Sequence, residues 1–160
     1  MGRVGCICGN ILSNSDCPSK DILHVYLVEK VNRMLEADPE ITLWDFYTTY
    51  DPIYQYWYCD ECKRVYLYSY KEPEGGWFGR IEASSVNGIK PDESWKELYV
   101  FTDVYIDQTT DLDMGFPLKE YLARKREYRY WYKEQEGLVL AYSGEELAFA
   151  YKVEHEITPY

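Results

Sequence analysis

Residues 54–69 read Tyr-Gln-Tyr-Trp-Tyr-Cys-Asp-Glu-Cys-Lys-Arg-Val-Tyr-Leu-Tyr-Ser, and residues 128–143 read Tyr-Arg-Tyr-Trp-Tyr-Lys-Glu-Gln-Glu-Gly-Leu-Val-Leu-Ala-Tyr-Ser. The two stretches align without a gap and share the run Tyr-Trp-Tyr. Their aromatic residues favour strands, and residues 59–62 between two such runs suit a tight hairpin turn. A match of this length at a fixed offset indicates an internal duplication.

The similarity continues on both sides of this match. Upstream, with the offset shifted by one residue, Leu43-Trp-Asp-Phe46 pairs with Leu118-Lys-Glu-Tyr121, and Leu23-His-Val-Tyr26 pairs with Leu98-Tyr-Val-Phe101. Downstream, after a loop two residues shorter, Arg80-Ile-Glu82 pairs with Lys152-Val-Glu154. Each half is therefore expected to contain a strand, a helical region and a three-stranded meander.

These patterns predict an α+β fold that is rich in antiparallel sheet and built from two degenerate repeats. Residues 1–83 are expected to form a zinc-knuckle half and residues 95–160 a metal-free half, together one compact unit. Residues 84–94 contain Asn-Gly and Lys-Pro, which are typical of turns and linkers, and are predicted to join the halves. Apolar residues at helical spacing predict helices over residues 31–37 and 117–126.

Composition supports a sheet-rich protein. The chain has 160 residues, enough for one domain or two small halves with a sizeable core, so disulfides are not needed for folding. It contains 18 Tyr, 5 Trp and 5 Phe, and aromatic side chains prefer the half-buried surface of a sheet.

The charge balance is acidic, with 17 Lys and Arg against 28 Asp and Glu and a formal net charge of −11. This charge repels polyphosphate, so a nucleic-acid partner is not favoured. A basic macromolecule is the natural electrostatic complement. An acidic balance is also common in proteins where it serves only solubility, and both interpretations stay open.

The chain has no run of eighteen apolar residues, and its first residues show no charged segment followed by a long apolar stretch. Neither a membrane span nor a secretory signal is predicted, and we expect a soluble cytoplasmic protein. In a reducing cytoplasm, closely spaced cysteines are metal ligands more often than disulfides. The odd count of five agrees, because four ligands leave Cys17 over.

Two cysteine pairs, Cys6-Ile-Cys8 and Cys59-Asp-Glu-Cys62, lie about fifty residues apart. A hairpin knuckle aims two sulfurs at one point, and a second pair completes a tetrahedral shell about 2.3 Å from zinc. Gly5 and Gly9 flank the first pair and let the backbone turn tightly. Four thiolates leave no position for water or substrate, so a structural zinc site is predicted with the ligands Cys6, Cys8, Cys59 and Cys62.

Two alternatives to zinc remain open from the residues alone. Iron in a rubredoxin-like electron-transfer site uses the same four thiolates, whereas unligated or disulfide-bonded cysteines hold no metal. Lys63, Arg64 and Arg3 lie close in sequence to the cysteines and are expected to offset the net charge of a metal–thiolate cluster.

The second half supplies an internal control for the metal site. Lys133 and Glu136 stand where the first half has Cys59 and Cys62, and the sequence near residue 80 contains no cysteine. An ion pair between Lys133 and Glu136 is expected to hold this turn together in place of the metal predicted in the first half.

The sequence offers no constellation typical of an enzyme. It contains no Gly-x-Gly-x-x-Gly, no phosphate-binding loop and no Gly-x-Ser-x-Gly. His24 lies in an apolar run and His155 near the C-terminus, and a packed or surface histidine is the more common role for both. The protein is therefore predicted not to be an enzyme.

The acidic run of residues 103–113 is the other candidate site. If it is helical, Asp103, Asp107 and Asp111 lie on one face at four-residue spacing. Such a stripe is most often a solvated face, it also suits docking of Lys and Arg from a partner, and a metal site is the third interpretation. Asp107, Asp111 and Asp113 are the residues we expect in a partner interface.

The segments Cys6–Ser15 and Trp57–Tyr66 together resemble a group of small bacterial zinc-knuckle proteins that act as immunity proteins of polymorphic and contact-dependent growth inhibition toxin systems. The resemblance implies stoichiometric capping of a cognate toxin domain, often a basic nuclease, with zinc in a purely structural role. The acidic charge agrees, because it favours fast association with a cationic cleft. The alternative is a non-catalytic adaptor, stabilised by zinc, for protein interaction or nucleic-acid association.

Overall fold

Strands dominate the secondary structure. The computed structural model describes residues 3–13, 22–49, 55–68, 76–102, 115–123 and 128–155. The strands are β1 (Arg3–Gly5), β2 (Ile11–Ser13), β3 (Ile22–Leu27), β4 (Gln55–Tyr58), β5 (Val65–Tyr68), β6 (Trp77–Ile81), β7 (Lys96–Thr102), β8 (Arg129–Lys133), β9 (Leu138–Ser143) and β10 (Glu146–His155). The helices are α1 (Val28–Ala37), α2 (Leu43–Thr49), α3 (Leu118–Ala123) and the 3-10 turns η1 (Ala83–Val86) and η3 (Glu134–Glu136).

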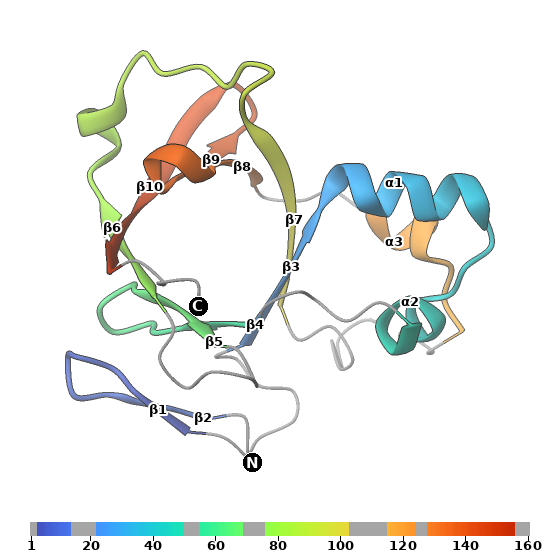
Figure 1. The fold of residues 1–160 in the computed structure, drawn as a ribbon, viewed down its shortest axis with the longest axis horizontal. Helices are drawn as coiled ribbons and strands as arrows, with labels where there is room; N and C mark the ends of the chain where they lie inside the picture. The colour runs from blue at the N-terminus through green and yellow to red at the C-terminus, as the bar shows by residue number, and fades with distance from the viewer. Residues whose placement is uncertain are drawn as a thin grey trace.

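Strands β3 to β10 close into one antiparallel barrel, seen nearly end-on in Figure 1. The order around the barrel is β10-β6-β5-β4-β3-β7-β8-β9. Apart from β6 and β7, barrel strands that follow each other in sequence are antiparallel neighbours, and two seams, β3–β7 and β6–β10, join residues that lie far apart in the chain. Strands β1 and β2 form a separate hairpin beside β4 and β5 (Figure 1).

Alternation along each strand divides side chains between the barrel interior and its outer surface. In β4, Tyr56 and Tyr58 line the interior, whereas Trp57 points outward and is fully buried beneath a cover. In β8, Tyr130 and Tyr132 line the interior. Because many strands bury both faces, the fold needs large residues at consecutive positions, which explains the aromatic-rich composition.

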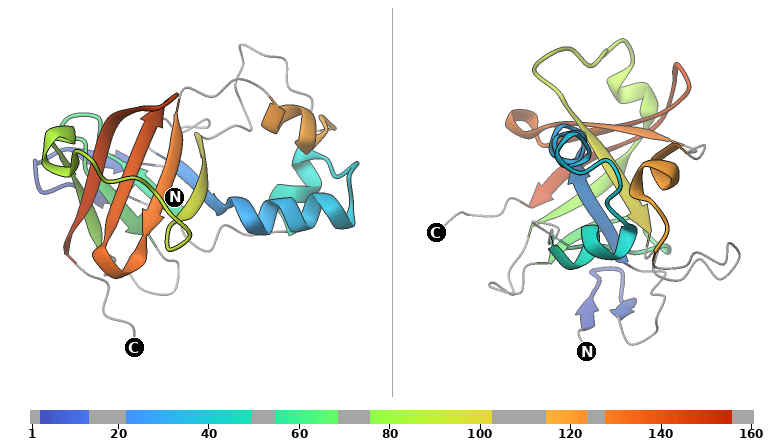
Figure 2. Two further views of the ribbon diagram at one scale, coloured as in Figure 1. Left: turned by 90° about the horizontal axis from the view of Figure 1, so that it is seen from above. Right: turned by 90° about the vertical axis from the view of Figure 1, so that its right-hand side faces the viewer.

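Three covers pack on the outside of the barrel, each with its own apolar cluster. The helical cover surrounds Phe46 and Val31 and lies to one side of the barrel, as Figure 2 shows from above. The β1–β2 cover packs Leu12 against Trp57. The third cover is the segment around η1, where Val86 and Trp95 are buried with Leu140.

The two hairpins that carry the shared Tyr-Trp-Tyr have the same register. In β4–β5, Trp57 is opposite Tyr66 and Tyr58 is opposite Val65. In β8–β9, Trp131 is opposite Leu140, and Tyr132 is opposite Val139. Adding 74 to both residue numbers of a pair in the first hairpin gives the corresponding pair in the second hairpin.

The two seams also have defined registers. In β3–β7, Val25 is opposite Val100. In β6–β10, Gly79 is opposite Lys152 and Arg80 is opposite Tyr151.

Helices α2 and α3 begin with reciprocal hydrogen bonds. The N–H of Leu43 donates to the carbonyl of Phe116, and the N–H of Leu118 donates to the carbonyl of Ile41, both at 2.9 Å. Each helix is thereby fastened at its first residue to the segment that leads into the other.

The prediction of an antiparallel, sheet-rich fold is confirmed, and the molecule is mostly β with a few short helices. The sequence did not predict closure into a single barrel. The predicted linker, residues 84–94, contains most of η1, and its Val86 is buried. Within the described residues, no helix is long and apolar enough to cross a membrane.

Candidate metal centre

The first pair of sulfurs is held by the turn between β1 and β2. The N–H of Cys6 donates to the carbonyl of Asn10 at 2.8 Å, and the N–H of Gly9 donates to the carbonyl of Cys6 at 2.9 Å. Gly9 has a φ of 94°, a conformation that residues with a side chain rarely adopt. The glycine after Cys8 is therefore required by the backbone of this turn.

The second pair is held by the turn between β4 and β5. The N–H of Cys59 donates to the carbonyl of Arg64 at 2.9 Å, and the N–H of Lys63 donates back to Cys59 at 2.8 Å. Lys63 has a φ of 62°, in the left-handed region that disfavours residues with a Cβ. The predicted tight hairpin at residues 59–62 is confirmed, and it closes through a strained lysine.

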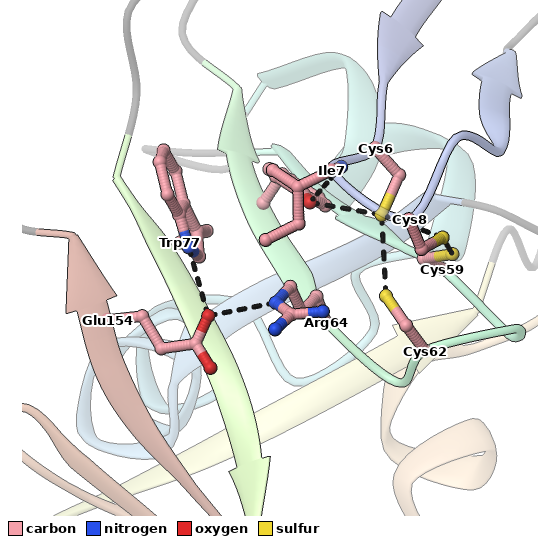
Figure 3. Close-up of polar contacts among 9 residues, drawn as sticks. Cys6, Ile7, Cys8, Cys59, Cys62, Arg64, Trp77 and Glu154 are labelled. Atoms are coloured by element: carbon pink, nitrogen blue, oxygen red, sulfur yellow. Dashed lines mark hydrogen bonds and ion pairs between the residues drawn. The ribbon is translucent and has the colours of Figure 1, made fainter.

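The two turns bring the sulfurs of all four predicted cysteines within 4.8 Å of one another. Figure 3 shows the four side chains converging from the two turns. The Sγ–Sγ distances are 3.3 Å for Cys6–Cys62, 3.3 Å for Cys6–Cys8 and 3.7 Å for Cys8–Cys59. Sulfurs about 2.3 Å from a tetrahedral zinc lie about 3.8 Å apart, so the spacing suits a metal ion. The four cysteines form no disulfide.

Polar groups beside the sulfurs orient the cluster. The hydroxyl of Tyr66 lies 3.0 Å from the Cys6 sulfur and accepts a hydrogen bond from the N–H of Ile7 at 3.1 Å. The side-chain amide of Asn10 donates to the Cys59 sulfur at 3.6 Å. Supporting hydrogen bonds of this kind fix the direction of metal ligands.

Thiolate formation is favoured in the second turn and opposed in the first. Burial raises the pKa of the Cys62 thiol, but the backbone N–H and guanidinium of Arg64 outweigh it and lower the pKa to about 6. The backbone N–H of Asn10 favours the Cys8 thiolate, yet contact with the Cys6 sulfur and desolvation raise the pKa of Cys8 to about 12. Crowded thiols cannot all ionise together without a cation between them.

Arg64 connects the cluster to the barrel seam. Its Nε donates to Glu154 Oε2 at 2.8 Å, and Trp77 Nε1 donates to the same oxygen at 3.1 Å (Figure 3). A Cβ added at Gly79 would lie 2.0 Å from Glu154 Oε1, so the carboxylate crosses β6 over a residue without a side chain. This bridge fastens the second turn to both strands of the β6–β10 seam.

Other predicted residues have varied outcomes. Lys133 Nζ lies 2.9 Å from Glu136 Oε1, so the expected ion pair across the turn is confirmed. His24 is buried on β3. Asp107, Asp111 and Asp113, predicted to contact a partner, lie outside the described residues, as does Cys17.

Sequence reasoning missed the Tyr66 contact, the Arg64–Glu154 bridge and a cavity inside the barrel. Arg64 was expected to offset the cluster charge, and its guanidinium favours the Cys62 thiolate as expected. Its further partner, Glu154, lies 90 residues away, and no local pattern signals that contact. The alternation of tyrosines in the two aromatic runs was the available signal for the cavity, because alternate residues of a strand share one face.

The fold and the site define a closed antiparallel barrel with an attached cluster of four cysteines. The chain belongs to the family described as "Domain of unknown function (DUF8617)", whose model matches residues 2–92. The matched region includes all four cysteines of the cluster and ends before β7. No curated protein and no solved structure matches the chain.

Proposed function

We propose that the four-cysteine cluster holds a structural zinc ion. The observation that carries this proposal is the convergence of four sulfurs from two separate turns to within 4.8 Å. Four thiolates complete a tetrahedral shell and leave no position for water or substrate. Iron suits the same ligands, so metal identity needs a measurement.

Elemental analysis of protein purified without added metal tests this assignment. We expect one zinc per chain and a colourless protein. Visible absorption from an iron–thiolate centre would assign iron instead, and protein that folds with no bound metal would contradict a metal site altogether.

We also propose that the barrel consists of two degenerate repeats related by an approximate twofold axis. In the sequence alignment of the two halves, residues 23–26 correspond to residues 98–101, so Val25 corresponds to Val100. These two equivalent residues are also opposite each other in the β3–β7 seam. The same 75-residue offset carries Thr42 onto Pro117, which form an isolated bridge. A pair that is carried onto itself lies on a twofold axis, so both pairs support the proposal.

The second seam is antiparallel like the first, with Gly79 opposite Lys152 and Arg80 opposite Tyr151. A crystal structure tests the repeats, since rotation about the proposed axis should overlay β3, β4 and β5 on β7, β8 and β9 in register, with β10 displaced by one residue at the bulge between Leu147 and Phe149. A shift of one residue in β7, β8 or β9 would contradict them.

We propose further that the protein is an immunity protein that caps a basic toxin domain in the cytoplasm and has no catalytic activity of its own. The formal net charge of −11 supports a cationic partner, which it would attract over long range. The resemblance of the two cysteine segments to zinc-knuckle immunity proteins supports the same role. A closed thiolate site supports a structural and not a catalytic metal.

Complex formation with the toxin domain encoded beside this gene tests the role. We expect a 1:1 complex on gel filtration, inhibition of the toxin and rescue of growth on co-expression. Association should slow as salt rises, because screening weakens electrostatic attraction. Separate elution of the two proteins, with the toxin still active, would contradict the proposal.

A charge-matched pair of variants tests the partner surface. Replacing Asp107, Asp111 and Asp113 by Asn removes three negative charges from the proposed interface. Replacing Glu29 and Glu36 by Gln and Asp38 by Asn removes three from exposed positions at α1 and its C-terminal end. We expect only the first variant to weaken toxin binding, by about tenfold or more. Equal effects would assign the role of charge to the whole molecule and not to these residues.

The second candidate function is a zinc-stabilised adaptor. Ile7 and Ile11 are 60% and 63% exposed on the β1–β2 hairpin beside the cysteines, which gives that hairpin an apolar surface for a partner. Replacing both by Ser should abolish partner binding in an adaptor that docks through this hairpin. Capping of a toxin through the acidic residues should be nearly unaffected.

A further inference from the structure

The barrel interior contains a cavity of about 470 Å³. Eight-stranded barrels either fill their interior with side chains or hold one small ligand, and small-molecule sites span roughly 300–1,000 Å³. The volume of this cavity is therefore typical of a barrel that holds one small ligand. Much of the wall is aromatic, with rings that include Tyr58, Phe78, Tyr130, Tyr132, Phe149 and Tyr151.

The rings of the wall hold one another in place. Phe149 contacts Tyr128 at a ring-centroid distance of 4.9 Å and Tyr151 at 5.7 Å, both edge to face. Across the interior, Phe78 contacts Tyr132 edge to face at 6.4 Å. These pairs are the arrangements that aromatic quadrupoles prefer, so the wall is preorganised to receive another aromatic ring.

Arg80 gives the cavity its charge. Among the described residues that line the cavity it is the only charged one. Its side chain is exposed, and its guanidinium carbon lies 4.5 Å from the ring centroid of Phe149. It forms no ion pair within the described part of the chain, so its donors have no carboxylate partner there.

Tyr151 adds a neutral polar group inside the cavity. Its residue is only 9% exposed, and its hydroxyl has no hydrogen-bond partner among the described residues. It is opposite Arg80 in the β6–β10 seam. Burial raises the pKa of Tyr151 above its ordinary value, so the hydroxyl stays protonated and available as a donor.

We propose that this cavity binds a small aromatic monocarboxylate. The aromatic ring lies between the tyrosine and phenylalanine walls, and the carboxylate is held by the Arg80 guanidinium and the Tyr151 hydroxyl. Guanidinium is suited to bidentate recognition of carboxylate. One cation balances one negative charge, and a net charge of −11 on the chain opposes a polyanion. The site does not depend on the toxin-capping role.

Two probes that differ only in charge test the proposal: 2-naphthoate and the neutral 2-naphthamide, titrated by isothermal calorimetry. We expect 2-naphthoate to bind with a Kd below about 1 mM and at least about tenfold more tightly than 2-naphthamide. In Arg80→Gln the preference should reverse, because the acidic protein then repels the anion. Lys152→Gln is the matched control, since it removes one positive charge from the exposed neighbour of Tyr151 and should keep the preference.

A second variant locates the binding. Val139 lines the cavity, and Val139→Phe fills part of it, so both probes should bind at least about tenfold more weakly while circular dichroism shows the fold retained. Equal binding of the two probes to the unmodified protein, or no binding of either, would overturn the proposal. A preference for 2-naphthoate that survives Arg80→Gln, or undiminished binding to Val139→Phe, would overturn it as well.

Discussion

The β4–β5 and β8–β9 hairpins share a register and a turn length but are fastened differently. The first turn carries Cys59 and Cys62 and ends at Lys63, with a φ of 62°. The corresponding residue of the second turn, 74 positions later, is Gly137, with a φ of 56°. The second turn carries an ion pair where the first carries two sulfurs. The same backbone path therefore forms with and without metal ligands.

The difference lies in what covers each hairpin. The outward Trp131 and Leu140 of the second are covered by the η1 segment, which buries Val86 and Trp95. The outward Trp57 of the first is covered by β1 and β2, strands of only three residues. An isolated two-stranded hairpin is at best marginally stable. A metal bound at the four cysteines would thus serve to attach the β1–β2 cover and not to shape the turn beneath it.

Removal of the metal should have the largest effect. Structural zinc contributes about 10–16 kcal/mol of apparent binding free energy in small domains. We expect a chelator to raise hydrogen exchange of residues 3–13 by about 100-fold, while residues 59–64 and 134–143 change by less than about threefold. Mass spectrometry of peptic fragments measures all three regions in one experiment.

Two serine variants serve as controls for this prediction. Cys59→Ser should reproduce the effect of the chelator, whereas Cys17→Ser, which removes the cysteine left out of the predicted metal site, should leave exchange unchanged. Continued protection of residues 3–13 in the metal-free protein would show that the apolar contact of Leu12 with Trp57 is sufficient to hold the cover.

The next largest effect is expected from substitution of Gly137, which occupies in the second turn the position that Lys63 occupies in the first. A Cβ at Gly137 would meet Val153 Cγ2 at 2.7 Å and would require a left-handed backbone. We expect Gly137→Ala to lower the free energy of unfolding by about 2–3 kcal/mol in urea denaturation. Gly144→Ala isolates the backbone cost, because Gly144 has a φ of 64° and open space around it, and should cost about 1 kcal/mol.

In the first turn, the reverse substitution, from a residue with a side chain to glycine, should raise the free energy of unfolding. Lys63 already bears the left-handed conformation, so Lys63→Gly should stabilise the metal-loaded protein slightly, by about 0.5 kcal/mol, after the extra chain entropy of glycine is subtracted. A destabilisation larger than about 1 kcal/mol would show that the cation–π contact of Lys63 with Tyr58, at 5.8 Å, outweighs the strain.

Local patterns predicted the parts of this molecule well. Aromatic runs placed β4 and β5 to within two residues, and residue type and spacing identified the four clustered cysteines. Those signals are local because each turn aims its own pair of sulfurs through backbone hydrogen bonds within five residues.

Long-range closure could not be predicted in the same way. The β6–β10 seam joins residues about seventy apart, and nothing in the sequence near Gly79 indicates that Lys152 lies opposite it. The bridge from Arg64 to Glu154 depends on that closure. The sequence therefore identified a cluster of cysteines but neither its attachment to the barrel nor the cavity that closure creates.

The Glu154 bridge should show a measurable coupling. Gly79→Ala forces the Glu154 carboxylate away from Arg64 and Trp77, and we expect it to lower the free energy of unfolding by about 1–1.5 kcal/mol. In the Glu154→Ala background the obstruction is gone, so Gly79→Ala should cost about 0.5 kcal/mol or less. Additive effects in this double-mutant cycle would contradict the bridge, and Gly5→Ala, at a site with open space, serves as the neutral control.

The smallest effect is expected at the ion pair of the second turn. The side chains of Lys133 and Glu136 are 22% and 51% exposed, and exposed pairs contribute about 0.2–1 kcal/mol, less in high salt. Glu136→Gln should therefore cost at most about 0.5 kcal/mol, and this cost should vanish in about 1 M salt. Lys133→Gln should cost more, because Lys133 Nζ also lies 5.6 Å from the ring centroid of Trp95 in the apolar cover. If Glu136→Gln instead exposed residues 134–143 to exchange as strongly as chelation exposes residues 3–13, the ion pair would be equivalent to the metal, and the contrast between the two covers would be wrong.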